Sequence, residues 1–253
     1  MLKIILSPTK KQIISPPSKI ELNTPSFIDK ASTLMDLLRG KTSNELKELL
    51  SISDKIVEEV FLYNQVWRNN PKKNTGSTAV FTFVGEAFNY LNPKYLTDDE
   101  LEYADKKLLI FSGLYGFLKP LDIIMPYRLD IADRLKIKEY NSLYDFWSKD
   151  LTSFLSKEVE KDNSGLLLDL SSKEYSKAIK FNNIPAKIIT PEFKVEIDGK
   201  LKTVAIWAKR MRGLMSREVI INKVTTEGGL QNLKFENFIL EDVTDNSYLY
   251  IKR

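Results

Sequence analysis

The chain has 253 residues, 43% of them hydrophobic, and its 38 Lys and Arg residues against 34 Asp and Glu give a net charge of +4. It contains neither Cys nor His, which excludes disulfides, cysteine nucleophiles, Ser-His-Asp triads, iron–sulfur clusters and zinc sites built from Cys or His. Acid–base chemistry would fall to Asp, Glu, Lys or Tyr, and we expect no cofactor and no bound metal.

The first apolar run, residues 2–6, predicts a buried strand. It is shorter than the core of a signal peptide, and Ser7-Pro8 interrupts it. No other apolar stretch approaches the length of a membrane span. We therefore expect a soluble, cytoplasmic protein that does not bind membranes.

Three helices and a strand are expected next. Apolar residues recur at helical spacing over residues 27–38 and stop at Gly40, a natural C-terminal glycine. A second such run covers residues 56–67 and ends before a proline. The β-branched and aromatic segment 78–83 predicts a strand, and the sequence Thr97-Asp98-Asp99-Glu100 predicts a capping box at the start of another helix.

The apolar run 108–111 leads into a pair of glycines, Gly113 and Gly116, with Lys119 and Arg128 close behind. Glycines three residues apart let the backbone turn tightly and approach a partner closely. Two interpretations are open: a hairpin whose N–H groups and neighbouring cations bind phosphate, or a simple turn after a buried strand.

The second half of the chain predicts a helix over residues 143–159, a strand over 166–170, a hairpin of strands 193–197 and 201–206 around Asp198-Gly199, and a final edge strand at 248–251. Helix and strand signals therefore alternate along the chain, without a linker or a repeat. We expect a single compact α+β (mixed α/β) domain over residues 1–253 with a mixed sheet.

A basic helix is expected after that hairpin. On a helical wheel, Lys209, Arg210, Arg212 and Arg217 share one face with Gly213 and Ser216, and apolar residues occupy the other face. Residues 207–217 hold four cations and no anion, so the rest of the chain is neutral. A localised basic helix favours an anionic partner such as nucleic acid, with the small residues allowing close approach of a phosphate backbone; the alternative is an ordinary solvated face.

Several segments together resemble the bacterial peroxide-stress-resistance family typified by YaaA, over nearly the whole chain. The segments that carry the resemblance are 6–10 (LSPTK), 52–55 (ISDK), 83–86 (FVGE), 112–122 (SGLYGFLKPLD), 126–129 (PYRL), 143–147 (LYDFW), 171–175 (SSKEY) and 209–217 (KRMRGLMSR).

The resemblance implies a cytoplasmic protein that helps cells to survive hydrogen peroxide, limits damage from iron and binds DNA through a positively charged cleft. It also implies a helix-hairpin-helix element, which maps to residues 98–125 with its hairpin at Gly113 to Gly116. We expect backbone contacts to duplex or branched DNA without sequence specificity. The expected DNA-binding residues are Lys10, Gly113, Gly116, Lys119, Arg128, Lys209, Arg210, Arg212 and Arg217.

Two other functions are compatible with these residues. Lys10 follows the end of the first strand and, with Asp122 and Lys119, could serve an enzyme that acts on a nucleotide or a damaged base; we nevertheless expect no catalytic activity. Iron binding would need converging carboxylates, but Asp98, Asp99 and Glu100 are better explained as the first turn of a helix. The sequence leaves the oligomeric state open.

Overall fold

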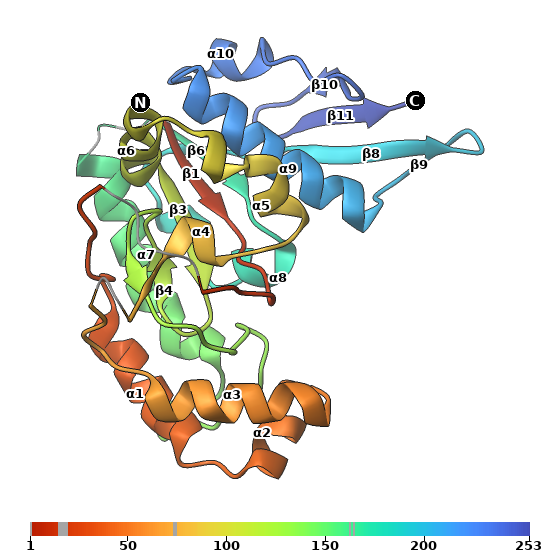
Figure 1. The fold of residues 1–253 in the computed structure, drawn as a ribbon. Helices are drawn as coiled ribbons and strands as arrows, with labels where there is room; N and C mark the ends of the chain where they lie inside the picture. The colour runs from red at the N-terminus through yellow and green to blue at the C-terminus, as the bar shows by residue number, and fades with distance from the viewer. Residues whose placement is uncertain (1, 15–19, 73–74, 162, 164) are drawn as a thin grey trace.

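The computed structural model describes residues 2–14, 20–72, 75–161, 163 and 165–253 (Figure 1). Its centre is a five-stranded sheet with the order β4-β3-β1-β6-β7. Strands β1 (Leu2–Leu6), β3 (Leu108–Ser112), β6 (Leu166–Leu170) and β7 (Lys187–Ile189) run parallel, and β4 (Gly116–Leu118) pairs antiparallel with β3. Every residue of β1 and β3 is buried, as the continuous apolar runs of parallel strands require.

The connections place later strands on both sides of β1. After β1 the chain returns through α6 (Asp98–Lys107) into β3 on one side, and α7 (Leu143–Lys161) then carries it past β1 to β6 on the other side. The strand order therefore reverses between β1 and β6. In open α/β sheets such a point leaves a crevice outside the carboxyl ends of the two strands.

A second, four-stranded sheet has the order β10-β11-β8-β9, from β8 (Glu192–Ile197), β9 (Lys200–Lys202), β10 (Ile239–Val243) and β11 (Tyr248–Lys252). The long helix α9 (Ala205–Ile221) lies between this sheet and the short helix α5 (Glu86–Leu91) (Figure 1). Helix α10 (Glu227–Gln231) follows α9. The hairpin β8–β9 projects from the body of the molecule (Figure 1).

Helices α1 (Ile28–Arg39), α2 (Ser43–Leu50) and α3 (Asp54–Val66) form one end of the molecule (Figure 1). The short elements are β2 (Ser77–Thr78), α4 (Ala79–Thr82), η1 (Pro93–Tyr95), β5 (Ile123–Ile124), α8 (Lys173–Ser176) and η2 (Phe181–Asn183). Buried residues from the three helices and both larger sheets belong to one hydrophobic core. None of the helices in the described ranges is long and apolar enough to cross a bilayer.

The mixed α/β fold class is confirmed, one helix was not predicted, and two local predictions are wrong. Helix α2 was not expected as an element of its own; its capping box at Thr42 and Glu45 marks its start. The segment 78–83 is mostly helical, as α4, and within it Thr82 Oγ1 donates to the Thr78 carbonyl at 2.9 Å. Strand β11 is interior: it pairs with β8 as well as β10, and Tyr250 stacks on Phe193.

The expected helix-hairpin-helix at residues 98–125 is also wrong. Helix α6 and its Thr97–Glu100 capping box are present, but β3, β4 and β5 follow, and residues 98–125, all of which the structure describes, contain no second helix. Gly116 has φ 72° and faces Trp147, and a Cβ on Gly113 would lie 2.4 Å from the Leu129 carbonyl oxygen. Both glycines are buried, so the hairpin is a core turn, and the interpretation as a simple turn is the correct one.

Candidate functional site

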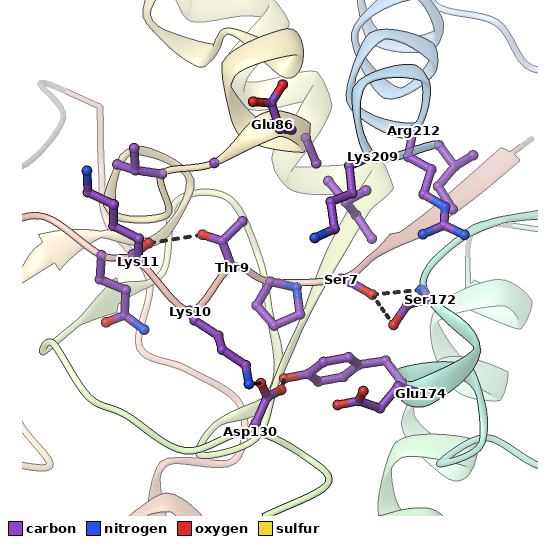
Figure 2. Close-up of a pocket in the computed structure, with 18 of the residues that line it drawn as sticks. Ser7, Thr9, Lys10, Lys11, Glu86, Asp130, Ser172, Glu174, Lys209 and Arg212 are labelled. Carbon is purple, nitrogen blue, oxygen red and sulfur yellow. Dashed lines mark hydrogen bonds and ion pairs between the residues drawn. The ribbon is translucent and has the colours of Figure 1, made fainter. Parts of the chain in front are cut away.

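A cavity of about 580 Å³ lies at the carboxyl ends of β1 and β6, where the strand order reverses (Figure 2). The loop after β1, residues 7–12, and the start of the segment after β6 form part of its lining. The loop that contains Arg128, the start of α5 and two side chains of α9 complete it. Its position is the one in which α/β folds bind ligands.

Hydrogen bonds join the two loops that follow β1 and β6. The Ser172 N–H donates to Ser7 Oγ at 2.8 Å, and Ser7 Oγ donates to Ser172 Oγ at 3.3 Å. Behind them, the buried Asp169 carboxylate accepts hydrogen bonds from the backbone N–H and the hydroxyl of Ser171 and from the Ser176 hydroxyl. Burial raises the pKa of Asp169, and these hydrogen bonds oppose that shift. Both loops are thereby fixed against each other.

Lys10 reaches into the cavity from the loop after β1. Its Nζ lies 3.1 Å from Asp130 Oδ2, with 64% of the Lys10 side chain exposed. The other Asp130 oxygen accepts a hydrogen bond from the Tyr175 hydroxyl, and Arg128 Nη1 donates to the Lys10 carbonyl at 3.1 Å. Three segments distant in sequence therefore meet at one carboxylate, and the Lys10 charge is balanced but accessible.

Lys209 and Arg212 extend from α9 toward Ser7 and Ser172 (Figure 2). Arg212 is partly buried; burial lowers its pKa, and attraction to the Asp169 carboxylate opposes this. An arginine nevertheless stays charged at neutral pH. Within the part of the chain that the structure describes, no hydrogen bond or ion pair engages the Arg212 guanidinium or the Lys209 ammonium. Both cations are therefore available to an anion in the cavity.

The rest of the basic helix has a structural role that the helical wheel did not predict. Arg210 Nε pairs with Glu86 Oε2 at 2.6 Å, and Arg217 donates to the carbonyls of Leu91 and Asn92. A Cβ on Gly213 would lie 1.8 Å from the Ala87 carbonyl oxygen. Ser216 is fully buried too. These side chains hold α5 against α9, so Gly213 and Ser216 leave no space for a phosphate backbone.

Lys119 and Asp122 lie outside the cavity. The Lys119 ammonium faces Glu158 of α7 at 3.9 Å, while Asp122 is buried and accepts the Lys119 backbone N–H at 2.8 Å. Lys10 and Asp122 are therefore not brought together, and the partner of Lys10 is Asp130. The proposed Lys10–Asp122 chemistry has no geometric basis, because Asp122 closes a turn between β4 and β5.

Burial raises the pKa of Asp122 to about 7, and the nearby Asp105 carboxylate adds to the shift, while the Lys119 backbone N–H and ammonium oppose it. The folded state then binds this proton more tightly than the unfolded chain, so stability falls as pH rises from about 4 to 7. The unaltered chain should therefore lose free energy of unfolding between pH 5 and pH 8. For Asp122→Asn, which keeps an acceptor for the N–H, we expect this decrease to be smaller by about 3 kcal/mol. Urea denaturation at both pH values measures it; an unchanged pH dependence would contradict the assignment.

The sequence did not predict Asp130, Ser172, Glu174 or Tyr175 as site residues, although they line the cavity. A usable signal existed, since Ser172, Glu174 and Tyr175 follow the predicted strand 166–170, and side chains that follow parallel strands gather at one edge of a sheet. The sequence does not show which strand lies beside β1. Only the tertiary structure shows that β6 does.

The acidic residues at the start of α6 are explained by helix capping. Thr97 Oγ1 accepts the Glu100 N–H, and the Glu100 carboxylate accepts the Thr97 N–H at 2.7 Å. This backbone hydrogen bond is the main cause of the lowered pKa of Glu100. Across the described residues, no group of three or more Asp or Glu side chains is arranged to hold a metal ion.

Comparison with known proteins gives consistent matches. The family model described as "Peroxide stress protein YaaA" matches residues 2–243. A UPF0246 protein of Flavobacterium johnsoniae is 34% identical over 238 residues, covering 94% of each chain. One from Burkholderia orbicola is 32% identical over 253 residues, covering 99% of this chain and 97% of the relative. The chain therefore belongs to the peroxide stress protein YaaA family.

Proposed function

We propose that this member of a peroxide-stress family acts in the cytoplasm by binding DNA, whose backbone phosphates contact the cavity described above. The observation that carries the proposal is the convergence of unpaired cations on a crevice at the reversal of the strand order. Lys209 and Arg212 face this crevice without a partner among the described residues, and Lys11 also lines its edge from the loop after β1.

The charge balance of the cavity favours an anion. Five cations line it, Lys10, Lys11, Arg128, Lys209 and Arg212, against the three carboxylates Glu86, Asp130 and Glu174. Two of those carboxylates are already neutralised, Asp130 by Lys10 and Glu86 by Arg210. The remaining field is positive, which attracts a phosphate backbone and concentrates it at the crevice.

The packing of α9 argues against reading of base edges. A recognition helix needs one free face to enter the major groove. Helix α9 contacts α5 along one side, and Trp207 packs against Phe238 on another. Lys209, Arg212 and Lys11 therefore supply affinity for phosphates, without sequence specificity.

The salt dependence of binding tests the proposal. If about four phosphates are neutralised, log K should fall with log salt at a slope of about −3 to −4, and Lys11→Ala/Lys209→Ala should make that slope shallower by about 2. Fluorescence anisotropy with a labelled duplex across a salt series measures both. Lys149→Ala/Lys157→Ala, which removes two exposed lysines from α7, serves as the matched control.

The control variant should keep the slope of the unaltered chain. A flat salt response, or an equal change in both double variants, would contradict a binding site in this cavity.

A further inference from the structure

Glu174 is an unexpected residue for a surface that binds only phosphates. It lines the cavity, its side chain is exposed, and no hydrogen bond or ion pair engages its carboxylate within the described residues. Figure 2 shows it beside Asp130, on the opposite side of the cavity from Lys209 and Arg212. An unpaired carboxylate repels phosphates, so its place indicates a ligand that also carries hydrogen-bond donors.

The cavity has two chemically different sides. Lys209 and Arg212 supply donors and positive charge on the α9 side, whereas Glu174 supplies acceptor oxygens on the other. The lining also includes Pro8, Tyr127 and Tyr175, residue types whose rings can pack against a flat ligand ring. The volume of about 580 Å³ lies in the range of sites for small ligands.

A nucleotide matches this arrangement, because its phosphate and the donor groups of its base lie at opposite ends. We propose that the cavity holds one unpaired nucleotide, with its phosphate at Lys209 and Arg212 and the edge of its base at Glu174. This inference rests on the proposed function when the nucleotide belongs to a DNA strand. A free nucleotide carries the same groups and is the other possible source.

The Glu174 carboxylate also determines which bases fit. Guanine offers a ring N–H and an amino group side by side, which together donate two hydrogen bonds to one carboxylate. Adenine and cytosine each offer an amino group. Thymine lacks one: its edge offers a single ring N–H, flanked by two carbonyl oxygens that would face the acceptor. The cavity should therefore prefer guanine to thymine, since only guanine can donate two hydrogen bonds to the carboxylate.

Duplexes that differ in one unpaired nucleotide test this inference. We would measure binding of the full chain to a blunt duplex and to the same duplex with a single overhanging guanine or thymine, and in parallel its binding to dGMP and TMP by calorimetry. We expect the guanine overhang to bind roughly tenfold more tightly than the thymine overhang. Glu174→Gln should reduce that ratio to about twofold or less, because an amide offers only one acceptor oxygen.

Glu58→Gln serves as the matched control, since Glu58 is an exposed residue of α3, away from the cavity lining. It should keep the tenfold ratio, and thermal unfolding of both variants should show that the fold is intact. Equal binding of both overhangs alongside salt-sensitive binding of the blunt duplex would overturn the inference and leave the proposed function standing.

Preference for dGMP over TMP that depends on Glu174, without binding of any duplex, would support the nucleotide site and overturn the proposed function. In that case the source is a free nucleotide. If Glu174→Gln left the preference for guanine over thymine unchanged with both overhangs and free nucleotides, the inference would be overturned for both sources.

Discussion

Gly213→Ala is expected to lower the free energy of unfolding by about 3 kcal/mol, in the upper range of overpacking effects. The new methyl group would lie 1.8 Å from the Ala87 carbonyl oxygen, a contact that only separation of α5 from α9 can relieve. Because Gly213 lies inside a helix, alanine would otherwise raise stability by up to about 1 kcal/mol. The sign of the change is therefore decisive, and urea denaturation measures it.

Gly228→Ala provides the comparison, since Gly228 also lies in a helix but nothing stands within 4 Å of its Cβ position. This variant should be as stable as the unaltered chain or slightly more stable. If Gly213→Ala were equally harmless, the close contact between α5 and α9 would not exist in solution.

Arg212→Gln is expected to weaken DNA binding by roughly 10- to 100-fold at fixed salt. Hydrogen bonds between a guanidinium and a phosphate are charge-assisted, and each contributes about 1.5–3 kcal/mol. The Arg212 donors are not used by any partner among the described residues, so their interaction with DNA is not offset by the loss of an internal contact. Arg212→Lys should recover only part of the affinity, because an ammonium keeps the charge but lacks the planar fork.

Arg68→Gln removes the same charge from an exposed position near the end of α3 and should change the affinity by less than about twofold. Fluorescence anisotropy against one duplex compares the three variants, and their thermal unfolding curves show whether each is folded. Equal losses for Arg212→Gln and Arg68→Gln would indicate a general charge effect and contradict a specific role for Arg212.

Local sequence signals predicted most of the individual elements. The apolar runs of β1, β3 and β6, the capping box at Thr97 and the turn at Asp198-Gly199 are each set by neighbours in the chain, and the structure contains all of them. The helical wheel failed where a second helix covers the first. It placed Gly213 on an open basic face because it contains no information about α5.

The candidate site was predicted only in part, for the same reason. Lys10, Arg128, Lys209 and Arg212 do meet in one cavity, whereas Arg210 and Arg217 bind α5, and Gly113 and Gly116 are buried. Charge and glycine content alone do not distinguish a cation that holds a helix from one that faces solvent. That distinction depends on strand order and helix packing, which involve residues more than 100 positions apart in the chain.

The attachment of α5 to α9 also affects how a ligand would enter. Glu86, Lys209 and Arg212 belong to two helices that are held together by an ion pair and by hydrogen bonds from the Arg217 guanidinium to backbone carbonyls. The Ser7–Ser172 hydrogen bonds fix the loops after β1 and β6 in the same way. A receptor whose walls are preformed loses little conformational entropy on binding. Its association rate would then be governed by diffusion in the electrostatic field and would fall as salt is added, with no slower step for closure of the cavity.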